Sequence, residues 1–344
     1  MNKRLEHSYL DIVTIFIVAF TIIAGGAIFL IQDAINIGRD KYRLMSALER
    51  IDYYNEKVDD KYIDRYLRIK LPVGVNEENL TITDNYVEKL LSITIPNADE
   101  DFIFRNPIVG SSNNISDIAV ESNDGKLHIE LFLDGVYEHE MFIEDNNLYV
   151  DFIDPHDLYD KIIVVDAGHG ANVPGTVENG VIEAEVNLAI SLYLKSLLDE
   201  SGIKAYYTRI ENVNPSFENR VGLANDLNAD MFISIHNNAA KGNNPYYTGT
   251  QVMYNENDDT GLSRRLADIC LDNVTESLEN VKRECIPGSS IYIIRKSQIP
   301  VALIEVGFLT NKEEAKRLSE EDYQKKAAEG IYNSIIQMYE EGLK

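Results

Sequence analysis

The sequence predicts an α/β domain with a mostly parallel sheet flanked by helices, preceded by a small all-β, sandwich-like domain and an N-terminal transmembrane helix. Apolar runs alternate with helical spacings after residue 160, short runs with turn residues precede them, and a long uncharged run lies near the N-terminus. The 344 residues suit about two domains of ordinary size. We therefore divide the chain into a membrane anchor (1–38), a helical stalk or linker (39–72), a small β domain (73–155) and the α/β domain (160–344).

The composition excludes several classes of protein. Hydrophobic residues make up 44% of the chain, enough for a buried core, so the chain is not wholly disordered. The net charge of −25 argues against a nucleic-acid partner, which requires cationic side chains. Residues 44–160 carry 26 acidic and 9 basic groups, which we interpret as a solvated, self-repelling surface. The two cysteines, Cys270 and Cys285, exclude a disulfide-rich scaffold, and we expect them to be unpaired.

The N-terminal element is a run of 20 uncharged residues, Ile12 to Ile31. As a helix it would span roughly 30 Å, the thickness of a bilayer core. Cleaved signal peptides have shorter apolar regions of about 7–15 residues. An uncleaved anchor is therefore favoured, with secretion after signal cleavage as the alternative. Basic residues lie on both sides of the run, so charge alone does not orient it.

The next two parts differ in periodicity. Helical spacing over residues 40–70 predicts a stalk, whereas residues after Pro72 read as short strands with turns between them. Asn123-Asp124-Gly125 is a strong hairpin signal. The predicted strand pairs are 80–83 with 87–95, 115–121 with 127–133, and 141–143 with 148–152, an arrangement typical of a sandwich.

The α/β domain begins with the apolar run Lys161–Asp166, which reads as a strand buried on both faces. Further strands are expected at 203–208, 231–235, 251–254, 291–294 and 301–306, with helices at 183–199, 217–227, 262–278 and most of 312–343.

Chemically active side chains follow the ends of these strands. His169 lies between two glycines after the first strand, and His236 directly follows the strand 231–235. Ligands of open α/β sheets bind beyond the carboxyl ends of the strands. Glu305 stands inside an apolar strand, where a carboxylate is costly unless it is paired, hydrogen-bonded or near a cation.

Two imidazoles and a carboxylate form a usual catalytic zinc set, with a fourth position left for water. Glu183, at the start of the helix after the His169 loop, is the best candidate for the carboxylate, and Glu185 and Glu178 remain alternatives. Asp166 is expected to accept a hydrogen bond that orients His169.

Four segments of the sequence resemble the motifs of a known protein family. The chain resembles the zinc-dependent N-acetylmuramoyl-L-alanine amidases of the amidase-3 family over about residues 161–340. The segments that carry it, in order, are Val165-Asp-Ala-Gly-His-Gly170, Gly180-Val-Ile-Glu183-Ala-Glu-Val-Asn-Leu188, Ser234-Ile-His236-Asn-Asn238 and Leu303-Ile-Glu305-Val-Gly-Phe-Leu-Thr-Asn311.

This resemblance implies one zinc ion held by His169, Glu183 and His236, with Glu305 as the catalytic carboxylate. It selects Glu183 over Glu185, because Glu183 stands three residues after Gly180. The implied reaction hydrolyses the amide between N-acetylmuramic acid and the L-alanine of the stem peptide, in cell-wall remodelling. The implied substrate is peptidoglycan. Because peptidoglycan lies outside the membrane, the anchor is expected to place Lys3 and Arg4 on the cytoplasmic side.

Other residues of the domain receive looser roles. Asn237, Asn238 and Arg295 are candidates for binding the substrate or the developing oxyanion. Arg220 is expected to brace the fold. The 69 residues between His236 and Glu305 contain one clear helix, 262–278, so we expect an open site without a blocking helix.

The small β domain resembles the AMIN-type domains that often precede such amidases, which implies an envelope partner; a plain spacer is the alternative. For the whole chain, three other functions stay open. These are a zinc peptidase acting on wall peptides, a non-catalytic wall-binding or activator protein, and a retaining glycosidase, which does not require the two histidines.

Overall fold

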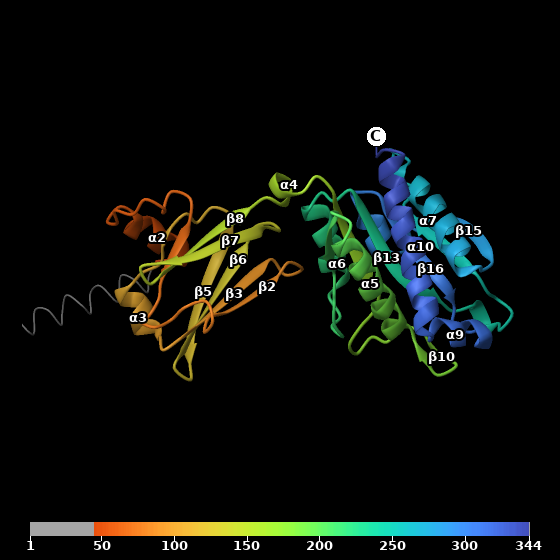
Figure 1. Ribbon diagram of the computed structural model, residues 1–344, viewed down its shortest axis with the longest axis horizontal. Helices are drawn as coiled ribbons and strands as arrows, with labels where there is room; N and C mark the ends of the chain where they lie inside the picture. The colour runs from red at the N-terminus through yellow and green to blue at the C-terminus, as the bar shows by residue number, and fades with distance from the viewer. Residues whose placement is uncertain (1–44, 344) are drawn as a thin grey trace, which may run out of the picture. The chain divides into compact units, whose positions relative to one another are not determined.

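The computed structural model of the chain describes residues 45–343 (Figure 1). It divides into two compact units. The first runs to Ile82 and includes Ser92–Leu131 and Met141–Asp151, and the second holds Thr83–Leu91, Phe132–Glu140 and Phe152–Lys344. The helix predicted over residues 12–31 lies outside the described residues. Within residues 45–343, no helix combines the length and the apolar character needed to cross a bilayer.

The β region consists of two four-stranded sheets, with strand orders β4-β1-β8-β7 and β2-β3-β6-β5 (Figure 1). Side chains alternate between buried and less buried along β3 and β6, as expected for strands with one face in a core. The strands are β1 (Leu67–Lys70), β2 (Thr81–Asn85), β3 (Leu90–Pro96), β4 (Val109–Gly110), β5 (Ile115–Asn123), β6 (Lys126–Leu133), β7 (Glu138–Glu144) and β8 (Asn147–Ile153), with the short helix α3 (Glu100–Arg105) between β3 and β4.

The hairpin predicted at residues 123–125 is confirmed. Asp124 and Gly125 both adopt positive φ angles, 47° and 70°, as a tight two-residue hairpin turn requires. The hairpin predicted near Asp84 turns later, because β2 continues to Asn85 and β3 begins only at Leu90.

The helical stalk predicted over 39–72 is wrong beyond one short helix, α2 (Ala47–Asn55), whose N-terminus is closed by a reciprocal capping box between Ser46 and Glu49. Residues 67–70 form β1, which pairs with β4 and β8. Leu67 and Ile69 are fully buried, and their spacing of two residues is the period of a strand, not of a helix.

The α/β unit is built on a six-stranded sheet in the order β12-β9-β13-β16-β14-β15. The first four strands are parallel; β14 runs antiparallel to β16, and β15 is parallel to β14. The mostly parallel sheet is therefore confirmed. The strands are β9 (Ile162–Ala167), β12 (Lys204–Tyr207), β13 (Met231–Asn238), β14 (Thr250–Tyr254), β15 (Lys282–Pro287) and β16 (Val301–Phe308), with the small hairpin β10 (Val177–Glu178) and β11 (Val181–Ile182) beside them.

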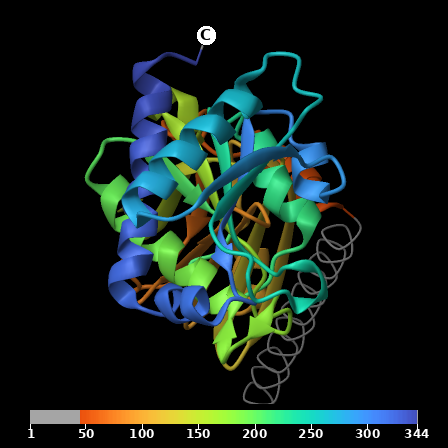
Figure 2. The same cartoon turned by 90° about the vertical axis from the view of Figure 1, so that its right-hand side faces the viewer.

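Helices cover both faces of this sheet. On one face α10 packs against both α5 and α7, over alternate strand residues such as Ile163, Ile233 and Ile304 (Figures 1 and 2). The other face, with Val164 and Phe232, packs against α6 and α8. The helices of the unit are α4 (Pro155–Leu158), α5 (Glu183–Asp199), α6 (Phe217–Asp226), α7 (Leu262–Leu278), α8 (Tyr292–Lys296), α9 (Lys312–Leu318) and α10 (Glu321–Glu340).

One predicted strand is wrong and another was not predicted. The strand predicted at 291–294 is replaced by the helix α8, which begins at Tyr292 after the extended Ile291 and buries the adjacent side chains of Ile293 and Ile294. A short apolar run fits a strand or a buried helical turn equally well. The missed strand, β15, lies at the sheet edge with a charged start, Lys282-Arg283-Glu284, so it lacks the apolar signal of the central strands. Cys270 and Cys285 are free, as expected.

Candidate active site

The loop after β9 turns sharply to present His169. His169 itself has a φ of 64°, in the left-handed region, and lies between Gly168 and Gly170. A Cβ at position 168 would clash with the imidazole of His236, so only glycine leaves room for that ring here.

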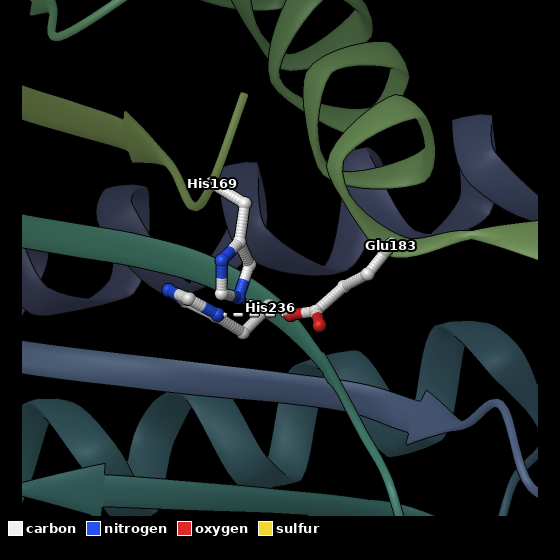
Figure 3. Close-up of side chains that lie close together, drawn as sticks. All are labelled: His169, Glu183 and His236. Atoms are coloured by element: carbon white, nitrogen blue, oxygen red, sulfur yellow. Dashed lines mark hydrogen bonds and ion pairs between the residues drawn. The ribbon is translucent and has the colours of Figure 1, made fainter. Parts of the chain in front are cut away.

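Three side chains from separate elements converge at this edge of the sheet (Figure 3). His169 comes from the loop, Glu183 from the first residue of α5, and His236 from β13. Oε1 of Glu183 lies 3.2 Å from Nε2 of His169 and 3.0 Å from Nδ1 of His236. Their candidate ligand atoms all lie within 4.8 Å of one another. The side chains of His169 and His236 are 28% and 17% exposed, so solvent reaches the site, as expected.

The other two carboxylates considered from the sequence do not join this cluster. Glu185 is exposed on α5, and Glu178 accepts a hydrogen bond from Nδ2 of Asn243. Oε2 of Glu183, in contrast, accepts a hydrogen bond from the backbone N–H of Thr176, which holds the carboxylate toward the histidines.

In this cluster, burial and the attraction between opposite charges shift the pKa values of the side chains in opposite directions. Burial alone would raise the pKa of Glu183, but the two histidines lower it well below its ordinary value. Burial likewise would lower the pKa of His236, but Glu183 raises it above its ordinary value. Without a metal, the carboxylate therefore attracts a proton onto the imidazole of His236, and a divalent cation would displace that proton on binding.

The residues fit a zinc ion on three observations. Two imidazoles and one carboxylate are a known catalytic ligand set. The carboxylate is 3% exposed and meets both histidines through a single oxygen, Oε1. A Cβ at Gly175 would lie 2.5 Å from Oε2 of Glu183 and 2.7 Å from Cδ2 of His169, so the chain leaves this space open.

Gly175→Ala is therefore expected to weaken zinc binding by about 10- to 100-fold, the range seen when the support of a metal ligand is disturbed. Gly180→Ala is the matched control, because Gly180 has a similar positive φ of 80° but nothing within 4 Å of its added Cβ. Zinc affinity measured by competition with a chromophoric chelator checks this result. Equal affinities in the two variants would contradict it.

Glu305 lies beside the cluster, in register with His236 across the β13–β16 pair. Its Oε2 is buried and has no hydrogen-bond partner among residues 45–343. Burial raises the pKa of Glu305 to about 7, although the neighbouring His236 acts in the opposite direction. A buried polar atom without a hydrogen-bond partner is rare in a folded protein, and a catalytic role is one of its recognised explanations.

The raised pKa of Glu305 makes the metal-free protein sensitive to pH. A carboxyl whose folded-state pKa exceeds its unfolded value of 4.5 favours folding below that value, and this contribution is lost as the pH rises through about 7. We expect the metal-free wild type to lose roughly 3 kcal/mol between pH 4.5 and 8 that the Glu305→Gln variant does not lose. Urea unfolding of both proteins after removal of metal measures the difference. Parallel pH profiles would contradict the expectation.

Asp166 does not orient His169, and this prediction is wrong. The fully buried carboxylate accepts hydrogen bonds from Thr208 Oγ1, Ser234 Oγ and Arg220 Nη1, all at 2.6 Å. Burial would raise the pKa of Asp166, but Arg220 and the two hydroxyls lower it below its ordinary value. Asp166 is thus the counterion of a buried arginine beneath the loop.

Two buried arginines, Arg209 and Arg220, donate to the backbone carbonyls of the His169 loop. Arg220 donates to the carbonyls of Ala167 and His169, which confirms its predicted bracing role. Arg209 donates to those of Ala167, Gly168 and Ala184 and thereby joins the loop to the start of α5. Arg209 was not predicted; its only signal in the sequence is that it follows the strand β12, which ends at Tyr207.

The three residues with predicted substrate roles lie in different environments, and none of them has a contact within the described part of the chain that shows such a role. Asn237 is 1% exposed, and its backbone N–H donates to Glu183 while its side chain donates to Asn187, so it supports a ligand instead of meeting a substrate. Asn238 is half-buried, 3.4 Å from Oε1 of Gln251. Arg295 is exposed on α8 and donates to the carbonyl of Ser289.

Comparison with known proteins agrees with this geometry. A family model described as N-acetylmuramoyl-L-alanine amidase matches residues 163–337. The chain is 35% identical over 181 residues to the uncharacterized protein YqiI of Bacillus subtilis (strain 168), covering 53% of this chain and 86% of that protein. It is 32% identical to the germination-specific N-acetylmuramoyl-L-alanine amidase of the same organism, covering 54% and 82%.

A crystal structure of an N-acetylmuramoyl-L-alanine amidase from Clostridium difficile 630 matches with a TM-score of 0.50 and 30% identity, covering 52% of this chain and 97% of that one. The family match extends over half of the chain and contains His169, Glu183, His236 and Glu305. The chain therefore belongs to the N-acetylmuramoyl-L-alanine amidase family.

Proposed function

We propose that this chain is a zinc-dependent hydrolase that cleaves the amide between the lactyl group of N-acetylmuramic acid and the L-alanine of the stem peptide. The observation that carries the proposal is the convergence of His169, Glu183 and His236 beside Glu305, whose buried Oε2 has no hydrogen-bond partner among residues 45–343. Membership of the amidase family supports the choice of bond.

In the proposed mechanism, three residues bind the metal and Glu305 transfers the proton. His169, Glu183 and His236 would hold one zinc ion, which supplies the Lewis acidity that polarises a carbonyl and makes water acidic near neutral pH. Glu305 accepts the proton of the attacking water and then delivers it to the leaving amine of L-alanine. Burial raises the pKa of Glu305 above that of an ordinary carboxyl, which supports a group that both takes up and releases a proton.

The arginine pair, Arg209 and Arg220, acts on the site without touching the substrate. Its hydrogen bonds to the loop carbonyls hold His169 in its left-handed conformation, in which the imidazole meets Glu183. Such preorganisation spares the site a rearrangement at the moment of reaction.

We also propose a location. Residues 12–31 anchor the chain in the cell membrane, with the α/β unit on the outer side, because peptidoglycan lies outside the membrane and the uncharged run is long enough to span it. The β region is proposed to be an AMIN-type domain that meets an envelope partner or acts as a spacer.

The test is digestion of purified peptidoglycan by the full-length protein in detergent, with and without a chelator. New amino-terminal L-alanine that disappears on chelation and returns with added zinc is expected, as measured by mass spectrometry of the released ends. New ends inside the stem peptide would favour a zinc peptidase, and new reducing sugar ends a glycosidase. Peptidoglycan left uncut under all conditions would favour a wall-binding or activator protein.

A further inference from the structure

A cavity of about 310 Å³ opens directly beside the two histidines. His169 and His236 form one end of its lining, and Val173, Phe217 and Ile293 contribute apolar side chains. Its volume lies at the lower end of the range of small-ligand sites, about 300–1,000 Å³. The roles described above use only the end of this space that His169 and His236 line, and they leave its apolar part unassigned.

Two of the apolar residues that line the cavity are exposed to solvent. Phe217, the first residue of α6, is 63% exposed, and Val173 is 41% exposed. The ring of Phe217 is held in place by stacking on Tyr292, with ring centroids 6.2 Å apart and an interplanar angle of 29°. An aromatic ring that is fixed by a neighbour yet open to solvent offers its free surface to a ligand at little entropic cost.

The charges of the cavity lining restrict the ligand. Asp166 and Arg220 are buried and bonded to each other, so neither offers its charge to a ligand. Glu218 is exposed and is the remaining charged residue of the lining apart from the histidines. Arg295 does not line the cavity; its guanidinium lies 5.8 Å from the Tyr292 ring and donates to the carbonyl of Ser289.

From this lining we infer that the cavity binds the sugar chain of peptidoglycan, on the carbonyl side of the scissile amide, an inference that rests on the proposed function. N-acetylated sugars are neutral, present C–H faces and acetyl methyl groups to apolar side chains, and donate hydroxyl hydrogens to a carboxylate such as Glu218. The lining thus offers apolar contacts and one exposed carboxylate as a hydrogen-bond acceptor, and a neutral sugar can satisfy both.

Two series of synthetic substrates test this assignment. One series keeps a dipeptide on the muramic acid and lengthens the sugar chain; the other keeps a disaccharide and lengthens the peptide. Phe217→Ala is expected to abolish about a tenfold gain in kcat/KM from added sugars and to leave the gain from added peptide unchanged, because losing the contact between the ring and the sugar removes that gain, which corresponds to about 1.4 kcal/mol. Phe217→Tyr, which keeps the ring, should retain the gain.

The controls separate binding from folding. Leu192→Ala changes an exposed apolar residue on α5 that does not line the cavity, so both series should behave as in the wild type. Glu218→Gln provides a second variant at an exposed position; it removes the charged acceptor and should weaken the gain from sugars while leaving the gain from peptides unchanged. Zinc content and melting temperature of every variant show whether the fold is kept.

The opposite pattern would overturn the inference: a Phe217→Ala protein that loses the gain from longer peptides but keeps the gain from longer sugar chains binds the peptide there. A variant that keeps both gains would also overturn it, because the cavity would then contact neither part. Wild-type protein that hydrolyses no member of either series would overturn the proposed function, and this inference with it.

Discussion

Glu305→Gln is expected to lower kcat for amide hydrolysis by about 10²- to 10⁴-fold, the usual contribution of a positioned acid–base group. Glutamine has nearly the same shape but neither accepts the proton of water nor donates one to the leaving amine. The ligand set of His169, Glu183 and His236 is untouched, so the zinc content should remain one per chain. Hydrolysis of a soluble muramyl peptide and metal analysis of the same preparation measure the two quantities.

Glu185→Gln is the control for this substitution. Glu185 is an exposed carboxylate on α5, two residues after Glu183, and its loss should leave both kcat and zinc content at the wild-type level. Full activity of Glu305→Gln would show that another group moves the proton. Loss of zinc from that variant would instead show that Glu305 is part of the ligand set.

Asp166→Ala is expected to destabilise the α/β unit by about 3–5 kcal/mol, because it leaves the buried guanidinium of Arg220 without its counterion. The hydroxyls of Thr208 and Ser234 lose their acceptor in the same step. Because Arg220 also holds the His169 loop, zinc affinity should fall as well. Urea unfolding followed by circular dichroism, together with a zinc titration, checks both effects.

Two further variants serve as comparisons for Asp166→Ala. Asp199→Ala removes the exposed partner of Lys195 on α5 and should cost no more than about 1 kcal/mol, as is usual for surface ion pairs. A double variant, Asp166→Leu with Arg220→Met, removes both buried charges and should cost less than the sum of the single changes. Strict additivity would show that the two groups do not act as a pair.

Much of this arrangement was predictable from the sequence because the central strands are long apolar runs that end in polar residues. The strands ending near His169 and His236, and the one carrying Glu305, are where the pattern places them. Parallel strands bring their carboxyl ends to one edge, so the convergence of the two histidines follows from topology. Glu183 required the family motif as well, because three nearby carboxylates have the same chemistry and differ only in where the chain turns.

The remaining features depend on contacts that a one-dimensional pattern does not contain. Asp166 precedes His169 by three residues, yet its partners Thr208, Arg220 and Ser234 come from other elements. Arg209 is buried and donates to loop carbonyls, contacts that its position in the sequence does not indicate. The sequence does not predict the edge strand β15 or the helix α8. Both segments lack a clear hydrophobic period, so the packing of neighbouring elements determines their secondary structure.

The three candidate zinc ligands come from three elements and from residues as far apart as 169 and 236. An unfolded chain has no reason to hold them within a few ångströms of one another. Under the proposed zinc binding, free zinc concentration is a variable of folding for this unit: each tenfold excess over the dissociation constant would add about 1.4 kcal/mol to the free energy of unfolding. Metal supply in the compartment where the chain folds would then affect the stability of the α/β unit.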